Sequence, residues 1–500
     1  MIANFVSVYC VLSTKCGNLS IKIVNNFFLF IFVFDKQLNY MRKVLLLIFV
    51  CFLHLSSHSQ CWQSVSAGGS HTIGIRTGGT LWSWGRNNFG QLGTAGVPSS
   101  SSNVPIQVGF DSDWSMVSAG SSFAVVLKTN GTIWGFGLNT SGQLGNNSTT
   151  NASVPIQIGA DSDWAYISSG DAFTLAIKNN GTLWGWGDNT GGQLGNGTSG
   201  SGNMMLVPTQ IGTSNWLKVS GGTNHTLAIK TDGTLWGWGT NNNGKLGNGT
   251  TVDSYVPIQI SALTTWQSVM AGQSHSVAKK NDGTVWTWGD NTNGQLGDGT
   301  SGATAYKTSP QNIGMSVSTS IARGYQHTLL RKNDGKLYAW GGNTSGQLGD
   351  GSNTQKVLPV LINNDSDWVT IDSKATHTVA LKSDGSLYAW GSNLNGKLGD
   401  GTFVDKNVPT IVNCPFLATE NFSLINKIKL YPNPVQNELT IELLEAITLD
   451  KISITDLSGK KLIEKITDFN TLNVASLAQG IYLLEIFSKE GNLQTKFVKN

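Results

Sequence analysis

Short segments in which hydrophobic and polar residues alternate run through most of the chain, with the period of two that is typical of β-strands. The clearest is HTLAIK at 225–230, where bulky residues alternate with smaller or polar ones. The Asp-Gly pair at 232–233 predicts a hairpin, because such turns need a residue with positive φ. LWGWG at 235–239 then places two tryptophans on one face and a glycine on the other, which favours close packing between sheets. A last short strand is expected at the Val-Pro pair 256–257, since proline is tolerated at a strand start or edge.

This pattern of three or four short strands recurs in strict register. In each copy the glycine of a Gln-Leu-Gly or Lys-Leu-Gly triplet lies 31 residues after the first position. The copies are seven in number, and their first positions are 62, 114, 164, 216, 266, 318 and 368. Such regular self-similarity is the mark of a repeat architecture.

The repeats are expected to close into a ring. Three or four short strands cannot cover both faces of their own sheet, whereas sheets stacked radially around an axis cover one another. An open stack would need atypical repeats at both ends. Here the first repeat is regular and the last differs only mildly, with Lys374 where the others have glycine. The pattern therefore predicts an all-β fold whose main domain, residues 60–414, is a seven-bladed β-propeller.

Composition agrees with many short strands and turns. Glycine accounts for 60 of 500 residues, and charged residues for only 13 %, about half the usual share. The net charge of +3 comes with no basic cluster or stripe, so no nucleic acid partner is expected, because phosphate binding needs concentrated Lys and Arg. All 17 tryptophans lie between Trp62 and Trp390, at repeated positions that indicate core packing.

The segment 41–59 has the organisation of a secretory signal peptide. A basic pair at 42–43 precedes an apolar stretch at 44–55, and small serines stand at the positions expected before a cut ahead of Gln60. Export of the chain is therefore expected.

Translation is expected to start at Met41, which would make residues 1–40 an upstream extension. The apolar run at 27–34 is too short to span a bilayer, although an upstream membrane anchor is the alternative. No stable transmembrane segment is expected in the mature chain.

The repeat consensus G-x-x-H-T-L-A-I-K-x-D-G-T-L-W-G-W-G-x-N-x-x-G-Q-L-G-x-G-T resembles the RCC1-like repeat family (regulator of chromosome condensation) across residues 62–414. The resemblance implies a seven-bladed propeller, in agreement with the number of repeats. The founding member of the family is a nucleotide-exchange factor for a small nuclear GTPase, a role that an exported chain is not expected to share. A secreted bacterial β-lactamase inhibitory protein with similar repeats, which binds its enzyme with one propeller face, is a closer precedent. Fold alone does not define function.

Composition changes after about residue 415, where tryptophan disappears and Lys, Glu, Ile and Leu rise. The segment 415–427 is expected to be a linker, and 428–500 shows the alternation of short strands. Its motifs resemble the type A C-terminal sorting domain of the type IX secretion system, with YPNP at 431–434, DLSGK at 456–460, GIY at 480–482 and KFVK at 496–499. The resemblance implies a small β-sandwich, often cleaved on export, with the type IX machinery as its partner. It also implies a secreted or outer-surface location, reached through the periplasm of a Gram-negative bacterium.

One histidine recurs at an identical repeat position, in His71, His225, His275, His327 and His377. A ring of imidazoles could suggest a metal, but Phe123 and Phe173 fill the same position in two repeats, and phenylalanine cannot be a ligand. Packing with a backbone hydrogen bond is the preferred interpretation, and no metal site is expected.

The segment DNTNGQLGD at 290–298 is similar to a calcium loop, but Thr292 and Gly294 are wrong for the third and fifth places of an EF-hand. Only the Asn after its first residue is constant among the repeats, at 87, 139, 189, 241, 291, 343 and 393. A constant Asn followed three residues later by Gly predicts a turn made by side-chain-to-backbone hydrogen bonds.

The sequence contains no G-x-S-x-G, H-E-x-x-H or phosphate-loop motif. Its conspicuous residues are all repeated, whereas a catalytic site is expected to break the symmetry. The chain is therefore expected not to be an enzyme, with neither catalytic residues nor a cofactor.

Symmetry is broken by the loop after the Gln/Lys-Leu-Gly triplet, which is longer in repeats one, three and five, at 94–104, 196–207 and 298–309. Variable loops on a rigid scaffold commonly carry binding residues. The apolar residues of this region are the candidate partner-binding residues, namely Met204, Met205, Tyr255, Tyr306 and Phe403.

Cys61 directly precedes the first repeat and Cys414 closely follows the last, 353 residues away. Ring closure would bring the two together, so the hypothesis is a disulfide that latches the first blade to the last. Export makes a disulfide permissible, and two separately buried thiols are the alternative.

These inferences predict a secreted or surface-displayed propeller that binds a protein or glycan through one face. The first alternative is an inhibitor of a secreted enzyme. The second is an extracellular enzyme that acts on glycans at the mouth of the channel.

Overall fold

The computed structural model describes residues 22–24, 27–29, 61–94, 100–316, 320–414, 428–445, 447–456, 461–488 and 491–500. The expected signal peptide at 41–59, the expected linker at 415–427 and most of 1–40 lie outside the described residues. In the N-terminal unit, residues 1–58, β1 (Lys22–Val24) pairs with β2 (Phe27–Leu29) in an antiparallel hairpin.

Each repeat folds into four consecutive antiparallel strands. In the first repeat these are β3 (Trp62–Ala67), β4 (His71–Arg76), β5 (Leu81–Arg86) and β6 (Ser101–Val108), hydrogen-bonded in chain order. The 17-residue β14 (Met205–Gly221) is both the fourth strand of the third repeat and the first strand of the fourth, so these two repeats share one sheet. The remaining strands are β7 (Trp114–Ala119), β8 (Phe123–Lys128), β9 (Ile133–Gly137), β10 (Ala152–Gln157), β11 (Trp164–Ser169), β12 (Phe173–Lys178), β13 (Thr182–Gly187), β15 (His225–Lys230), β16 (Leu235–Gly239), β17 (Ser254–Ser261), β18 (Trp266–Ala271), β19 (His275–Lys280), β20 (Thr284–Gly289), β21 (Lys307–Ser316), β22 (Ser320–Arg323), β23 (His327–Arg331), β24 (Leu337–Gly341), β25 (Lys356–Leu361), β26 (Trp368–Lys374), β27 (His377–Lys382), β28 (Leu387–Gly391) and β29 (Lys406–Val412). Short 3₁₀ turns occur at η2 (Ser201–Asn203), η3 (Asn242–Gly244) and η4 (Leu394–Gly396).

The second and third strands of each sheet form the core. In β15, which the alternation predicts, every residue but the last is buried, because each sheet is covered by a neighbour on both sides. Leu227 of β15 pairs with Gly237 of β16, and Ile229 pairs with Leu235. The fourth strand, such as β17, is only partly buried and forms the rim of the ring.

An aromatic side chain on the third strand, tryptophan in six repeats and Phe136 in the second, packs each sheet against the one before it. Trp238 is fully buried, and a Cβ on Gly195 would lie 2.6 Å from its Nε1 atom. Gly195 also has a φ of +70°, so both the contact and the backbone require glycine. The indole N–H of Trp238 donates to the carbonyl of Gln193 at 2.9 Å. These contacts explain why the Gln/Lys-Leu-Gly triplet keeps its spacing.

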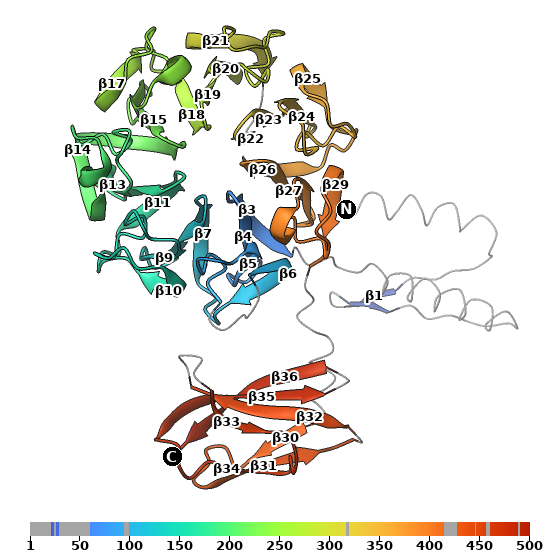
Figure 1. Cartoon of the computed structure of the whole chain (residues 1–500). Helices are drawn as coiled ribbons and strands as arrows, with labels where there is room; N and C mark the ends of the chain where they lie inside the picture. Colours follow the sequence, from blue (N-terminus) through green and yellow to red (C-terminus); the bar gives the residue numbers. More distant parts are fainter. Residues whose placement is uncertain are drawn as a thin grey trace, which may run out of the picture. The chain divides into compact units, whose positions relative to one another are not determined.

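The last sheet packs against the first with the same glycine–tryptophan contact, so the ring is closed. A Cβ on Gly399 would lie 2.5 Å from Nε1 of Trp84. The backbone N–H of Trp62 donates to the carbonyl of Gly385 at 3.1 Å. Trp62 and Trp84 belong to one hydrophobic cluster with residues of β27 and β28, including Leu387. Figure 1 shows the sheets around a central axis, with β3 near β26 and β27.

Cys61 and Cys414 form a disulfide, and their Cα atoms are 6.1 Å apart. The disulfide hypothesis is confirmed, because closure places the start of β3 beside the end of β29. Arg76 adds a contact here, since its Nη2 atom donates to Cys414 Sγ at 3.3 Å.

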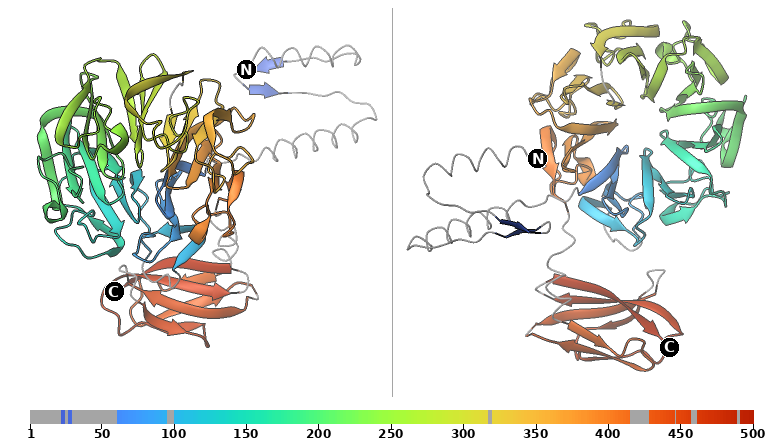
Figure 2. Two further views of the ribbon diagram at one scale, coloured as in Figure 1. Left: turned by 45° about the horizontal axis from the view of Figure 1, so that its top comes forward. Right: turned by 180° about the vertical axis from the view of Figure 1, so that it is seen from behind.

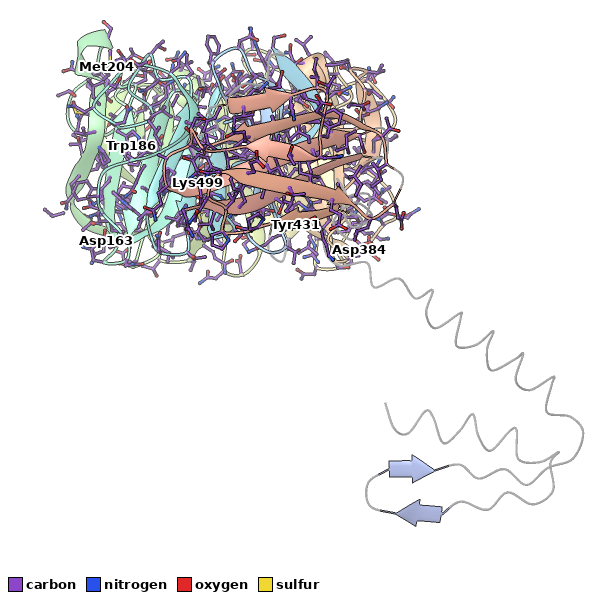
Figure 3. All side chains as sticks on the ribbon, turned by 90° about the horizontal axis from the view of Figure 1, so that it is seen from below. Asp163, Trp186, Met204, Asp384, Tyr431 and Lys499 are labelled. Carbon is purple, nitrogen blue, oxygen red and sulfur yellow. A yellow bond between two sulfur atoms is a disulfide. The ribbon has the colours of Figure 1, made fainter. Side chains whose placement is uncertain are left out.

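The ring has two faces, which its connections define. The hairpins between second and third strands, and the links between repeats, lie on one face, which we call the hairpin face. The loops between third and fourth strands lie on the opposite face, which we call the loop face. Figure 3 shows Met204 of the loop face at the opposite edge of the ring from Asp163 and Asp384 of the hairpin face. The first strands line the axis and the fourth strands lie outermost (Figure 1, Figure 2).

The C-terminal segment forms two sheets that share one apolar cluster. The first sheet has the order β30 (Ile428–Tyr431), β31 (Glu438–Leu443) and β34 (Thr471–Asn473). The second has the order β33 (Lys461–Lys465), β32 (Leu449–Thr455), β35 (Gly480–Ser488) and β36 (Gly491–Lys499). Leu439 and Ile441 of the first sheet pack in the same cluster as Ile454 and Leu484 of the second. The strands that the alternation predicts are present.

Candidate binding sites on the axis and the loop face

The recurring histidines are contacts between neighbouring sheets. His225, His275, His327 and His377 are fully buried, and Nε2 of each lies 3.0–3.3 Å from a Ser or Thr hydroxyl on the next sheet. The packing role is confirmed, but the hydrogen bond goes to a hydroxyl of the next sheet and not to the backbone. Burial, with a contribution from Arg323, lowers the pKa of His275 to about 3, so this imidazole is neutral at neutral pH.

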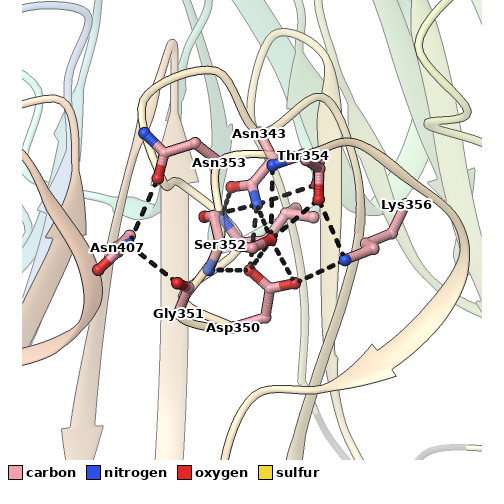
Figure 4. Close-up of polar contacts among 9 residues, drawn as sticks. Asn343, Asp350, Gly351, Ser352, Asn353, Thr354, Lys356 and Asn407 are labelled. Atoms are coloured by element: carbon pink, nitrogen blue, oxygen red, sulfur yellow. Dashed lines mark hydrogen bonds and ion pairs between the residues drawn. The ribbon is translucent and has the colours of Figure 1, made fainter.

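The constant asparagine holds the loop between the third and fourth strands, as Figure 4 shows for Asn343. Its Oδ1 atom accepts the Leu348 N–H at 3.0 Å. Its Nδ2 atom donates to Asp350 Oδ1 and to the carbonyls of Ser352 and Thr354 at 3.0–3.1 Å. The prediction of a turn made by side-chain-to-backbone hydrogen bonds is confirmed.

The same loop is also fastened to its surroundings. Lys356 Nζ lies 3.3 Å from Asp350 Oδ2, and Asn407 of the next sheet donates from Nδ2 to the carbonyl of Gly351 at 3.0 Å. Figure 4 shows both contacts. The loop between β24 and β25 is therefore held in place at its base and on two sides.

The predicted partner-binding residues lie around the loop face in four different repeats. Phe403 is 57 % exposed, Tyr255 41 % and Tyr306 37 %. Met204 and Met205 are half-buried, and Met205 packs against two hydrophobic clusters between sheets. Of the two methionines, Met205 therefore contributes to the packing of the ring.

Two further apolar residues lie in the same loop as Phe403. Leu394 is 70 % exposed and Val404 is 64 % exposed. We call Leu394, Phe403 and Val404 the apolar loop patch. In the sixth repeat the positions equivalent to Leu394 and Phe403 hold the polar Thr344 and Asn353. A position-by-position comparison of the repeats could have found Leu394 from the sequence.

A second departure from symmetry lies on the axis, where the first strands end. Six repeats have glycine at the position that Lys374 fills in the seventh. One position earlier all repeats have small residues except the sixth, which has Arg323. One position before that, Asp372 stands where the first four repeats have serine. One position after the lysine, the third repeat has Asp171 and the sixth has Tyr325.

These side chains cross the axis and fill it at the loop face. Lys374 Nζ donates to three backbone carbonyls of the second and third repeats at 2.9–3.2 Å and lies 3.6 Å from Asp171 Oδ1. The Tyr325 hydroxyl donates to Asp171 Oδ2 at 3.1 Å. The space left among these groups is too small for a water molecule.

The ionisable groups on the axis shift one another's pKa values. Burial lowers the pKa of Lys374 to about 8, and the charge of Asp171 opposes this shift. Burial raises the pKa of Asp372, and the charge of Arg323 opposes it. Opposite charges close together thus counteract the effect of burial on both groups.

Toward the hairpin face the axis widens into a cavity of about 460 Å³, which we call the axial cavity. Every repeat contributes lining residues from its first strand. The lining includes Val65, Ser66, Met116, Tyr166, Ser220, Met270, Arg323, Asp372 and Lys374. This volume is in the range of small-molecule sites. In the described ranges no group of three or more His, Cys, Asp or Glu side chains could hold a metal ion.

Sequence reasoning noted Lys374 only as a mild departure from the repeat and missed the other axial residues. A signal was present, because Arg323, Asp372 and Lys374 replace small or neutral residues at adjacent positions of the repeat. Their convergence is visible only once the ring brings the sixth and seventh repeats opposite the third.

A closed ring of antiparallel sheets, with first strands at the axis and fourth strands at the rim, defines the class: the repeat region is a β-propeller. Within this class the chain belongs to the RCC1-like domain family, whose model matches residues 51–363. Models of the regulator of chromosome condensation (RCC1) repeat match residues 368–397 and 384–423. The resemblance inferred from the repeat consensus is confirmed.

Known proteins that resemble the chain differ in what they do. It is 29 % identical over 306 residues to the ultraviolet-B receptor UVR8 of Arabidopsis thaliana, covering 60 % of this chain and 57 % of the receptor. The chain thus spans little more than half of that relative's length. The structure of yeast RCC1 (Prp20) bound to Kap60 has a TM-score of 0.61 at 20 % identity, covering 75 % of this chain and 87 % of that one. Human WBSCR16 has a TM-score of 0.58 at 23 % identity, covering 65 % and 88 %. At these identities the solved structures show the shared fold.

A second family model, the secretion system C-terminal sorting domain, matches residues 429–500. The resemblance of the C-terminal motifs is therefore confirmed, and the sorting domain points to secretion or display on the cell surface. Among the residues that the structure describes, none of the helices has the length and apolar character needed to cross a membrane.

Proposed function

We propose that the chain is an exported binding protein. Its residues 60–414 form a seven-bladed propeller with one blade per repeat, and 415–427 link it to a β-sandwich at 428–500. Four strands per repeat and the contacts between the last and first sheets support the blade number. The apolar cluster shared by the two C-terminal sheets supports the sandwich.

The export route in this proposal has two signals. Residues 41–59 act as the signal peptide, with translation from Met41, and lead the chain into the periplasm of a Gram-negative bacterium. The sorting domain then engages the type IX machinery, which the family match at 429–500 supports. The mature propeller is released or held at the outer surface.

The proposed role is recognition of a protein or glycan partner through the loop face, without catalysis. The observation that carries this proposal is the apolar loop patch, in which Leu394 and Phe403 are exposed at positions that are polar in the sixth repeat. The loop beneath them is rigid, because Asn393 Nδ2 donates to the carbonyl of Val404 at 3.2 Å and its Oδ1 accepts the Leu398 N–H at 3.0 Å. Apolar side chains held in place on the surface favour binding, since little conformational freedom is lost when a partner covers them.

The test uses the full chain as bait against culture fluid and intact cells. The double variant Leu394→Ser/Phe403→Ser is expected to lose most of the captured partner, because it removes the exposed apolar area. The matched control is Phe110→Ser on the hairpin face, where Phe110 is 56 % exposed against 57 % for Phe403. The control is expected to capture the partner as the unchanged chain does, and equal capture by the double variant would contradict a role for the loop face.

The identity of the captured molecule separates the alternatives. One secreted enzyme that is captured and inhibited would make the chain an inhibitor. A polysaccharide would make it a glycan-binding protein. Turnover of a glycan panel, lost on changing one residue that breaks the symmetry, would make it an enzyme and reject the non-catalytic role.

A further inference from the structure

Most polar groups that line the axial cavity are already satisfied. Serine hydroxyls at one position of the first strand each accept a hydrogen bond from the backbone N–H of the next repeat at 2.8–3.2 Å. The pairs are Ala119 N–H to Ser66, Ser169 N–H to Ser118, Gly221 N–H to Ser168, and Ala271 N–H to Ser220. These four hydroxyls therefore bind the ring together.

The two carboxylates on the axis are occupied as well. Asp372 accepts hydrogen bonds from the Ser66 hydroxyl, the Ala67 N–H and the Ser373 N–H, each at 2.9 Å. Asp171 accepts from the Tyr325 hydroxyl and from the Thr223 hydroxyl, and it pairs with Lys374. Lys374 has all three of its protons directed at backbone carbonyls.

Arg323 is the positively charged residue of the cavity that has an unused hydrogen-bond donor. Its Nη2 atom donates to the carbonyl of Gly221 at 3.0 Å, and its Nη1 atom donates to that of Ser373 at 3.4 Å. Its Nε atom is buried and has no hydrogen-bond partner among the described residues. Asp372 and Asp171 act on the guanidinium only through space. A buried guanidinium bonded only to carbonyls still lacks the planar, negatively charged partner that fits its fork of donors.

Tyr166 provides a second binding group in the same cavity. Its hydroxyl makes no hydrogen bond to the residues that the structure describes, and Tyr166 and Arg323 both line the cavity. Met116 on β7 and Met270 on β18 supply apolar wall. A few converging polar groups on a partly apolar wall are typical of small-ligand sites.

We propose that the axial cavity is a carboxylate-binding site entered from the hairpin face. The carboxylate accepts hydrogen bonds from the guanidinium of Arg323 and from the hydroxyl of Tyr166, and the body of the ligand packs on Met116 and Met270. The carboxylate comes either from a free organic acid or from an acidic side chain of a peptide. The site is separate from the apolar loop patch, so it stands or fails independently of the proposed loop-face function.

The test measures binding to the full chain by titration calorimetry with acids and their uncharged counterparts. The probes are benzoate with benzamide, glucuronate with glucose, and a blocked Gly-Glu-Gly peptide with its Gly-Gln-Gly counterpart. Acids are expected to bind and the uncharged counterparts are not. Arg323→Met is expected to weaken the binding of acids by roughly 10- to 100-fold, and Tyr166→Phe by roughly tenfold, in line with the loss of charge-assisted hydrogen bonds. Arg86→Met, which changes an arginine of the loop face, is the control and leaves the affinity unchanged.

Each outcome bears on the site. Binding of benzoate or glucuronate identifies a free acid as the ligand, and binding of the Glu peptide alone identifies an acidic side chain. If Arg323→Met does not fold, Tyr166→Phe still tests the site, because it removes only one hydroxyl. Equal affinity for acids and uncharged counterparts, unchanged affinity in the variants that fold, or no binding of any probe would overturn the proposal.

Discussion

At the residue scale, the buried histidines combine shape with one hydrogen bond. His275 fills the position that Phe123 and Phe173 fill in other repeats, and its Nε2 atom lies 3.0 Å from the hydroxyl of Thr328. The shape can be supplied by an aromatic hydrocarbon, whereas the hydrogen bond cannot. The imidazole also binds protons in the unfolded chain, whereas it stays neutral in the folded ring.

This makes the stability of the ring depend on pH. Burial lowers the pKa of His275 to about 3, from an ordinary value of 6.5. As the pH falls below 6.5 the unfolded chain takes up a proton that the folded chain refuses, so the free energy of unfolding decreases until the pH reaches about 3. At about pH 5 this one histidine lowers the stability by about 2 kcal/mol relative to neutral pH.

We expect His275→Phe to flatten this dependence. The variant should lose about 1 kcal/mol at neutral pH with the hydrogen bond. Because it avoids the loss of about 2 kcal/mol that the unchanged chain undergoes between neutral pH and about pH 5, it should be about 1 kcal/mol more stable than the unchanged chain at about pH 5. Thr328 keeps its bond to the carbonyl of Gln295 at 2.9 Å. Urea unfolding followed by tryptophan fluorescence at both pH values provides the measurement.

His71→Phe is the matched comparison. Burial lowers the pKa of His71 to about 3 as well, but neither of its ring nitrogens has a hydrogen-bond partner among the described residues. This variant should gain the same resistance to acid without the loss at neutral pH. An unchanged pH dependence in both variants would show that other groups cause the loss of stability at low pH.

At the scale of the element, the loop between the third and fourth strands is organised by one side chain. Asn343 replaces missing backbone pairing with four hydrogen bonds, to Leu348, Asp350, Ser352 and Thr354. The loop can therefore vary in length and surface residues, as it does between repeats, while its base stays fixed.

We expect Asn343→Ala to lower the free energy of unfolding by about 2–3 kcal/mol, because several buried donors and acceptors lose their partner together. Hydrogen exchange of the Leu348 N–H should become faster, since that group loses the Asn343 oxygen. Asn353→Ala in the same loop is the control, because the bonds of Asn353 are exposed and 3.4–3.5 Å long, and it should change stability little. Equal effects from the two variants would argue against the central role of Asn343.

The strands and hairpin turns are the part of the fold that the sequence predicts well. The alternation in HTLAIK and the Asp-Gly pair each specify a local structure, and β15 and β16 appear where they place them. The constant spacing of the Gln/Lys-Leu-Gly glycine follows from a contact such as Gly195 with Trp238, which every repeat reproduces with tryptophan or, at Gly93, with Phe136. Because the same spacing recurs in all seven repeats, the local pattern of one repeat also predicts how successive repeats pack.

The candidate sites were less accessible to prediction, because they depend on departures from the repeat. Phe403 was predicted from the variable loop, but Leu394 lies next to the constant Asn393 and was overlooked. The contact between Lys374 and Asp171 joins residues far apart in the sequence across the axis of the ring. Periodicity cannot reveal such a contact, since it specifies which positions face the axis but not which side chains meet there.

At the scale of the whole molecule, the ring is closed by non-covalent contacts and by a covalent bond. Gly399 packs on Trp84, and Cys61 is bonded to Cys414. The packing of glycine on tryptophan matches that between other sheets, whereas the junction of the last and first sheets lacks a continuous backbone. The disulfide takes the place of that backbone.

We expect Cys414→Ser to lower the free energy of unfolding by about 2–4 kcal/mol, because the unfolded chain is then no longer constrained by a cross-link over 353 residues. Cys61→Ser should have the same effect, and the double variant should be no less stable than either. Chemical unfolding with and without a reductant provides the measurement. Reduction should destabilise the unchanged chain alone, and separate Cys61 and Cys414 peptides that alkylate freely without reduction would disprove the bond.

The bond between Cys61 and Cys414 also makes the propeller a covalent circle. A protease in the surroundings of the cell that cuts one exposed loop converts the circle into a line, but both new ends belong to the same molecule. No fragment can diffuse away until a second cut is made or the sulfur bridge is reduced. Survival of single nicks is therefore a property that this molecule gains from where its two cysteines are placed.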